Sequence, residues 1–214
     1  MTTEATLSVE MLAVTPRAEQ TIELAGRTAY KSFDRITDTS AGEFIGRIVR
    51  SGHESVLEHT SASFRIKGIS RACSHQLVRH RIASYTQSSQ RYADESGAEY
   101  VVPPSIAESG EVCDLYLKYL ENVGEMYECL KDAGIPSEDA RFVLPNACST
   151  EIVMSANFRE WRHFLEVRGD HHAQWEIRAL AIKIYGILAR EAPSVFSDFS
   201  VVTHPTAGRC LVKG

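Results

Sequence analysis

The strongest constraint on the fold is an alternation of apolar and polar residues in the segment from Thr60 to Lys67. The apolar members, Ala62, Phe64 and Ile66, are separated by single polar residues. Because successive side chains of a β-strand point to opposite faces, this pattern predicts a strand with one buried and one solvent-facing side. Gly68 follows directly and is expected to end the strand.

Helical periodicity accounts for much of the remaining chain. The helices that it predicts span Arg17–Tyr30, Ala41–Arg50, Ser70–Arg81 with Ser70 as the N-cap, Ile106–Ala133, Asn157–Val167 and His172–Arg190. Short strands are expected at Tyr100–Val102 and Glu151–Ser155, with a polar loop at Ser84–Gly97. Because the few strands are separated by helices, the expected fold class is α+β. We expect a mixed or antiparallel sheet and several flanking helices, two of them long.

Length and charge limit the class of protein further. A chain of 214 residues suits one domain, taken as residues 1–214 with short tails at both ends that can be flexible. A formal net charge of −5 argues against a dedicated nucleic-acid binder, so no nucleic-acid partner is expected. An anionic ligand would therefore have to be bound by a local cluster of arginines.

The chain shows no signal for a membrane or an oxidising compartment. No apolar run approaches the ~20 residues that cross a bilayer. The first residues lack the basic and apolar regions of a signal peptide, so we expect no membrane association and a cytoplasmic location. The five cysteines show no C-x-x-C spacing and are expected to be free thiols. Cys148 is the cysteine to watch, because it follows Arg141 by only a few residues.

Residue types that suit a phosphate and a pyrimidine base crowd into Arg79–Tyr92, RHRIASYTQSSQRY. Guanidinium groups bind phosphate bidentately, and hydroxyl groups complete such a site. Amide side chains such as Gln76 and Gln87 can pair with the carbonyl and imide edge of uracil. The pattern also has a structural interpretation. Arginine and histidine near a helix C-terminus oppose the macrodipole, and a polar loop is often only a connection.

Several ordered motifs resemble those of the flavin-dependent thymidylate synthases. Arg79, His80 and Arg81, followed after seven residues by Ser89, match the R-H-R signature of that family. Further similarity lies in Ser51–His59, Ala140–Pro145, the pair Asn157 and Arg159, and Val167–Ile177. The resemblance runs from Ser32 to about Pro193, and several motifs in one order are more specific than one short pattern.

The resemblance implies a set of residues for each ligand. For FAD it implies Ser55, Glu58, Arg79, His80, Arg81, Thr86, Gln87, Asn157, Arg159, His163 and His172, together with Ser32. For dUMP it implies Gln76, Arg79, Gln87, Ser88, Ser89, Arg91, Arg141 and Arg168. As catalytic residues it implies Arg168, Ser89 and His53, with His53 beside the flavin and the folate. Thr86-Gln87 and His163 stand where some members have Asn-Glu and Asn, so their contacts can differ.

The resemblance also implies the reaction, a reductive methylation of dUMP to dTMP. Methylenetetrahydrofolate would donate the carbon, and FAD reduced by NADPH would supply the hydride. The flavin hydride, rather than an enzyme nucleophile, is thought to activate the uracil in this family. The family is a homotetramer with active sites at subunit interfaces, so the resemblance implies a homo-oligomer, expected to be a tetramer.

Two other functions fit the same residues. One is a nucleotide- or flavin-binding regulatory module that lacks the reaction. The other is a flavin- and folate-dependent methyltransferase of uridine in RNA, which the acidic charge disfavours. A metal site is not expected, because His75 and His80 would lie on different helix faces and the adjacent His171 and His172 would point apart.

Overall fold

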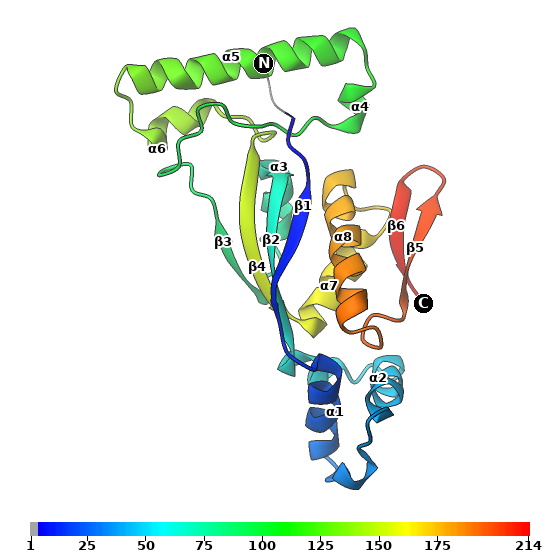
Figure 1. The fold of residues 1–214 in the computed structure, drawn as a ribbon. Helices are drawn as coiled ribbons and strands as arrows, with labels where there is room; N and C mark the ends of the chain where they lie inside the picture. Colours follow the sequence, from blue (N-terminus) through cyan, green and yellow to red (C-terminus); the bar gives the residue numbers. More distant parts are fainter. Residues whose placement is uncertain (1–3) are drawn as a thin grey trace. The chain divides into compact units, whose positions relative to one another are not determined.

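The computed structural model describes residues 4–214 and has an α+β fold, which confirms the predicted class (Figure 1). Within these residues an antiparallel sheet has the strand order β1-β2-β4-β3, and a hairpin pairs β5 with β6. The strands are β1 Ser8–Val14, β2 Ser61–Ser70, β3 Ala83–Gln87, β4 Ser149–Asn157, β5 Phe199–His204 and β6 Gly208–Lys213.

Helices connect and follow these strands. The α-helices are α1 Ala18–Thr28, α2 Ser40–Arg50, α3 Arg71–Leu77, α4 Pro104–Ala107, α5 Glu111–Asp132, α6 Ser137–Ala140, α7 Phe158–Gly169 and α8 Trp175–Glu191. Short 3-10 helices are η1 Phe33–Arg35, η2 Glu54–His59 and η3 Arg141–Val143. The two longest helices, α5 and α8, fall where the sequence predicts long helices. In the described part of the chain, no helix combines the length and the apolar character that a membrane span requires.

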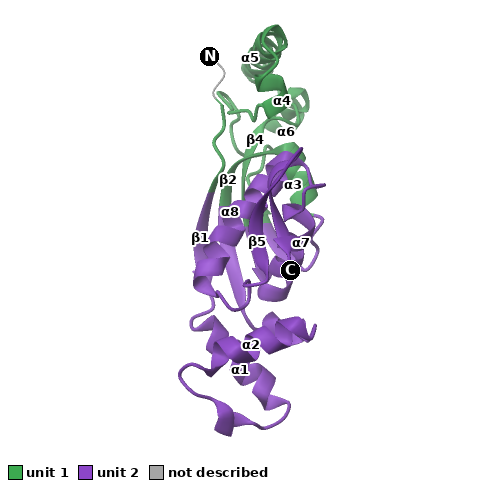
Figure 2. Ribbon diagram, turned by 90° about the vertical axis from the view of Figure 1, so that its right-hand side faces the viewer, with its two compact units in different colours: residues 1–8, 66–78, 86–153 green, residues 9–65, 79–85, 154–214 purple. Residues whose placement is uncertain are grey.

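The chain divides into two compact units (Figure 2). Unit 1 comprises residues 4–8, 66–78 and 86–153, and unit 2 comprises residues 9–65, 79–85 and 154–214. In unit 1, Tyr100, Leu120 and Cys148 form a small buried core. Leu120 comes from α5, which also buries Val123 and Tyr127. One face of this amphipathic helix therefore packs in unit 1.

Helix α7 is central to the packing of unit 2. It contacts α8, η2 and β6. Its fully buried Trp161 meets Phe64 edge-on, with ring centroids 5.1 Å apart. The indole N–H of Trp161 donates a hydrogen bond to the carbonyl oxygen of Ala62. Ala62 and Phe64 are therefore buried, as the alternating pattern predicts.

A buried arginine fixes α7 within unit 2. Arg162 is only 1% exposed and donates two hydrogen bonds of 2.7 Å to the carboxylate of Asp198. It also donates to Glu54 at 3.1 Å and to the carbonyl oxygen of Val195. A buried charge is costly unless it is paired, and this one is paired with two carboxylates. These contacts fix the position of α7, which also bears the predicted site residues Arg159, His163 and Arg168.

Two predicted boundaries are wrong. Strand β2 does not end at Gly68 but continues to Ser70. Gly68 adopts a φ of 71°, and a Cβ atom there would overlap the carbonyl oxygen of Thr6, so glycine permits a close backbone approach instead of ending the strand. Helix α3 begins at the predicted N-cap, because Ser70 Oγ accepts a hydrogen bond from the backbone N–H of Cys73. It ends at Leu77 rather than at Arg81.

Other differences concern the connections. The predicted loop at Ser84–Gly97 begins within β3. The single helix expected at Ile106–Ala133 is divided into α4 and α5, with Gly110 at a φ of 56° before α5. Tyr100 forms isolated bridges to Glu4 and Cys148 rather than a short strand. The hairpin β5–β6 has no counterpart in the sequence-based prediction.

Candidate active site

The predicted site residues fall into two groups, one in each unit. Unit 2 carries Ser32, His53, Ser55, Glu58, Arg79, His80, Arg81, Asn157, Arg159, His163, Arg168 and His172. Unit 1 carries Gln76, Thr86, Gln87, Ser88, Ser89, Arg91 and Arg141. Each group contains hydrogen-bonded clusters that sequence alone does not define.

In unit 2, a hydrogen-bonded series joins the start of α7 to its last turn. Asn157 caps the helix, its Oδ1 accepting the backbone N–H of Glu160 at 2.8 Å, as a capping-box-like pattern indicates. The Oε1 atom of Glu160 lies 3.0 Å from Nδ1 of His80. On the other side of the same imidazole ring, Arg168 Nε donates to His80 Nε2 at 3.0 Å. Of the predicted residues, His80 and Arg168 are thus brought into direct contact.

Burial controls the charge of this series. His80 is 5% exposed, and its burial lowers its pKa below the ordinary value, while the hydrogen bond to Glu160 acts in the opposite direction. The positive charge of Arg168 and the nearby His163 lower the same pKa further. Tyr85 donates a hydrogen bond to the carbonyl oxygen of His80, and burial raises the pKa of Tyr85 to about 12. The lowered pKa of His80 favours the neutral form of its imidazole.

Exposed arginines lie next to the residues of this hydrogen-bonded series in the sequence. The side chains of Arg79 and Arg81 are exposed on either side of His80. In the first turn of α7, Arg159 Nη1 lies 2.5 Å from Glu58 Oε1, and both side chains are about half exposed. Exposed guanidinium groups suit a pyrophosphate, so this donor set fits a dinucleotide such as FAD.

In unit 1, Gln87 is a structural link as much as a ligand candidate. Its Nε2 donates to Ser74 Oγ at 3.0 Å and to Thr150 Oγ1 at 3.2 Å. These bonds join β3 to α3 and β4. The preceding residue, Thr86, is exposed. Sequence reasoning predicts Gln87 as a ligand and misses the two hydroxyl partners, because their proximity depends on tertiary structure.

A cluster of arginines in unit 1 includes two residues that contact the Ser88–Ser89 loop. Arg71 Nη2 donates to the carbonyl oxygen of Ser88 at 2.8 Å. Burial lowers the pKa of Arg71, and the nearby positive charge of Arg141 lowers it further. The backbone N–H of Arg91 donates to Ser89 Oγ at 3.3 Å. Such a set of guanidinium and hydroxyl groups can bind a phosphate.

Arg71 is a member of this cluster that the sequence analysis misses. A signal was present, because Arg71 is the first residue of α3 and a cation is unfavourable beside the positive N-terminal end of the helix dipole. A charge placed against the dipole often has a specific partner. The partner here is the Ser88 carbonyl group.

The prediction that His171 and His172 point apart is wrong. Their ring centroids are 3.7 Å apart, and both Nδ1 atoms face Asp170, at 3.3 Å for His171 and 2.8 Å for His172. The turn explains this arrangement, since Asp170 Oδ1 also accepts the backbone N–H of His172. These three side chains have donor atoms close enough to share a metal ion. The His204 ring from β5 stacks on His171 at 4.4 Å.

Cys148 is poorly suited to nucleophilic attack. The thiol is fully buried, and burial raises the pKa of Cys148 to about 12, to which the nearby Glu95 carboxylate contributes. Its sulfur accepts a hydrogen bond from Gln90. All five cysteines are free thiols, as predicted.

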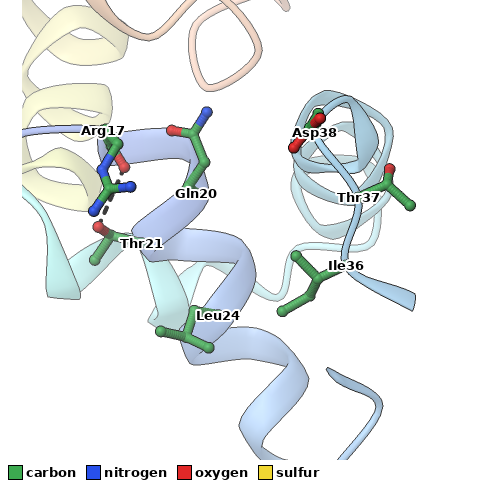
Figure 3. Close-up of a pocket in the computed structure, with 7 residues that line it drawn as sticks. All are labelled: Arg17, Gln20, Thr21, Leu24, Ile36, Thr37 and Asp38. Carbon is green, nitrogen blue, oxygen red and sulfur yellow. Dashed lines mark hydrogen bonds between the residues drawn. The ribbon is translucent and has the colours of Figure 1, made fainter. Parts of the chain in front are cut away.

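A separate pocket lies in unit 2 (Figure 3). It has a volume of about 490 Å³ and is lined by Arg17, Gln20, Thr21, Leu24, Ile36, Thr37 and Asp38. Figure 3 shows the side chains of α1 on one side and those of Ile36–Asp38 on the other. Its lining includes none of the predicted site residues.

Comparison with known proteins gives one family. The chain matches the Thy1 family model, described as thymidylate synthase complementing protein, over residues 10–194. It is 42% identical over 200 residues to the flavin-dependent thymidylate synthase of Geobacter sulfurreducens. This alignment covers 90% of this chain and 86% of that protein. It is 43% identical over 200 residues to the flavin-dependent thymidylate synthase of Mycobacterium avium, with coverage of 85% and 80%.

A solved structure has the same fold. The UMP/dUMP methylase PolB from Streptomyces cacaoi, bound with 5-Br dUMP, matches this chain with a TM-score of 0.83. The match covers 92% of this chain and 96% of the other at 24% sequence identity.

Proposed function

Since this chain belongs to the Thy1 family, we propose that its two groups of polar side chains bind the substrate and cofactor of a flavin-dependent thymidylate synthase. The chain is an enzyme of this kind and methylates dUMP to dTMP. Methylenetetrahydrofolate supplies the carbon, and FAD reduced by NADPH supplies the hydride when bound.

The arginine cluster of unit 1 is the observation that carries the substrate assignment. Arg71 and Arg91 contact the Ser88–Ser89 loop, and Arg141 lies near Arg71, in a chain whose net charge is −5. A local excess of guanidinium groups in an acidic protein favours a dianionic phosphate, which accepts charge-assisted hydrogen bonds. We assign Arg91, Arg141 and Ser88 to the phosphate of dUMP. Arg71 would position the loop through its hydrogen bond to the carbonyl oxygen of Ser88.

Arg168 is assigned to the uracil ring. A half-buried guanidinium can stabilise negative charge that develops on the uracil carbonyl groups, and it acts most strongly when its orientation is fixed beforehand. The hydrogen bond from Arg168 Nε to His80 supplies such a constraint. By resemblance, Gln76 and Gln87 are also assigned to dUMP, and Arg79 is assigned to both dUMP and FAD. Ser89 and His53 complete the set assigned to the reacting end.

The exposed basic residues of unit 2 are assigned to FAD. Arg79, Arg81 and Arg159 would bind the pyrophosphate, with Ser55, Glu58, Asn157 and His163 as further polar contacts. His80 would contribute through its neighbours, because each of its ring nitrogens already has a protein partner. Thr86 and His172 are exposed and complete the assigned set.

The FAD assignment can be tested by cofactor retention. Arg81→Ala should weaken FAD binding about tenfold or more, the value of one charge-assisted hydrogen bond. The matched control is Arg209→Ala, which removes an exposed arginine of β6 outside the assigned site. Flavin absorbance after dialysis measures retention. Full retention by the Arg81 variant would contradict the assignment, as would equal loss in both variants.

We also propose that the protein works as a homo-oligomer, a tetramer. Helix α5 exposes four large apolar side chains, Val112, Leu115, Tyr119 and Met126, each 50–69% exposed. Their spacing of three, four and seven residues places them on one helix face, and such a stripe is typical of a protein interface. The free thiols favour a cytoplasmic location.

Sedimentation at micromolar concentration tests the oligomer. The parent should sediment as a species larger than the 23.8 kDa chain, and Leu115→Glu should dissociate it in part. A parent protein that is a stable monomer would contradict this part of the proposal.

A further inference from the structure

Glu160 is a buried carboxylate that the sequence resemblance leaves without a function. It is 6% exposed and lies in the first turn of α7, where the helix dipole favours a negative charge. Its backbone N–H is bound by Asn157, which holds this turn in place. Its carboxylate faces Nδ1 of His80 at 3.0 Å.

The partner on the other side of His80 fixes the direction of both hydrogen bonds. Arg168 Nε carries a hydrogen and can only donate, so Nε2 of His80 must accept. In a neutral imidazole the single proton then resides on Nδ1, where it is donated to Glu160. A doubly protonated ring would place an N–H of its own against the Arg168 N–H.

The remaining neighbours of His80 favour the same neutral form. The charged or titratable groups that face it are Glu160 and His163 of α7, Arg168 of the same helix, and Tyr85 of β3. The Phe164 ring meets the imidazole edge-on at 5.3 Å and adds apolar surroundings. Burial lowers the pKa of His80, and Arg168 and His163 act in the same direction against Glu160.

We propose that Glu160 is a positioning residue for the substrate arginine. By accepting the Nδ1 proton of His80, it keeps the Nε2 lone pair directed at Arg168 and so fixes the plane of the Arg168 guanidinium group. The inference rests on the proposed assignment of Arg168 to the uracil. It adds that the binding of dUMP depends on a buried carboxylate that touches neither ligand.

Two substitutions separate positioning from simple packing. Glu160→Leu removes the acceptor, leaves the Nδ1 proton without a partner and allows the proton to move to Nε2. We expect it to weaken dUMP binding to the FAD-loaded protein about tenfold, the value of one charged hydrogen bond. Glu160→Gln keeps an acceptor oxygen and should restore most of the affinity.

The matched control is Glu23→Leu. Glu23 is also buried, at 1% exposure, and its carboxylate pairs with Arg27 and Ser40 in α1 and α2. This control should lower the stability of the protein without changing dUMP affinity. A loss of affinity that tracks stability in all the variants would show that Glu160 only supports packing, and would overturn the proposal.

A spectroscopic measurement reads the tautomer of His80 directly in the parent protein. Nitrogen NMR of histidine-labelled protein should show His80 as the neutral tautomer with the proton on Nδ1, and the signal is assigned by its loss in His80→Gln. A proton on Nε2 would overturn the proposal. The dUMP affinity of the parent should also fall as the pH is lowered through the depressed pKa of His80, and a flat profile there would overturn it.

These readouts distinguish the inference from the function on which it rests. If the FAD-loaded parent fails to bind dUMP at all, the proposed substrate assignment fails, whatever the tautomer. If the parent binds dUMP and Glu160→Leu binds it equally well, only the positioning role fails.

Discussion

The Nε atom of Arg91 lies 3.3 Å from Oε2 of Glu138, in an ion pair whose two side chains are about half exposed. The backbone carbonyl group of the same glutamate accepts a hydrogen bond from Arg141 Nε at 3.0 Å. Glu138 therefore meets two arginines that we assign to the phosphate of dUMP. An exposed ion pair contributes at most about 1 kcal/mol to stability, so Arg91 can exchange this partner for a phosphate at little cost.

Arg91→Ala should therefore weaken dUMP binding without destabilising the protein. We expect a loss of about tenfold or more in affinity, since one charge-assisted hydrogen bond is removed. The free energy of unfolding should change by no more than about 0.5 kcal/mol, as for other surface substitutions. Calorimetric titration with dUMP and urea unfolding measure the two effects. Normal affinity combined with a large loss of stability would make Arg91 a structural residue.

Glu138→Gln should have the opposite effect on dUMP. The substitution removes a negative charge that competes with the phosphate for Arg91. The same charge also repels the phosphate. At low ionic strength we expect dUMP to bind more tightly by roughly two- to fivefold, an effect that should shrink at high salt because exposed charges are screened. Titrations of parent and variant at two salt concentrations give the comparison. Weaker binding by the variant would mean that Glu138 orients Arg91 instead of competing for it.

The stability of the protein should depend on pH through His80. Burial lowers the pKa of this histidine in the folded state, so the unfolded chain binds a proton more readily. The contribution of His80 to stability is therefore fully present above the unfolded value of about 6.5 and is lost as the pH falls below it. His80→Gln cannot titrate.

Urea unfolding of parent and variant between neutral and acidic pH measures this contribution. The stability difference between the two proteins should shrink as the pH is lowered, because only the parent loses the histidine contribution. Parallel profiles would show that His80 titrates normally in the folded protein.

No cysteine should be required for turnover. Burial holds the pKa of Cys148 at about 12, so its thiolate is negligible at neutral pH. We expect that changing all five cysteines to serine, or Ser89 to alanine, leaves measurable dTMP formation at a reduced rate. The test is dTMP formed from dUMP and folate by the FAD-loaded variants. Complete loss of product in a variant that still binds FAD and dUMP would indicate covalent catalysis by that residue.

Elements with local signals could be predicted from the sequence. The alternation around Phe64 gives β2, and the apolar spacing around Ile184 gives α8. The side-chain caps Ser70 and Asn157 are likewise encoded within a few residues of each helix start. Each of these signals depends only on residues close in the chain.

Features that depend on residues distant in the chain could not be predicted. From the sequence alone, Gly68 is interpreted as the end of a strand. The structure shows that glycine is needed there because the carbonyl group of Thr6 occupies the space that a Cβ atom would take. Glu160 and Thr150 gain their importance from His80 and Gln87, each more than 60 positions away. The motifs predicted the candidate ligand residues by resemblance, but not the side chains that orient them.

The central claim is that this chain makes dTMP by flavin-dependent methylation, and anaerobic turnover tests it most directly. The protein is loaded with FAD, reduced with NADPH and mixed with dUMP and methylenetetrahydrofolate, with the NADPH omitted in a parallel sample. The account predicts that NADPH bleaches the flavin absorbance and that dTMP forms only when the flavin is reduced. If FAD and dUMP bind and the flavin is reduced, but no dTMP appears, the account is contradicted.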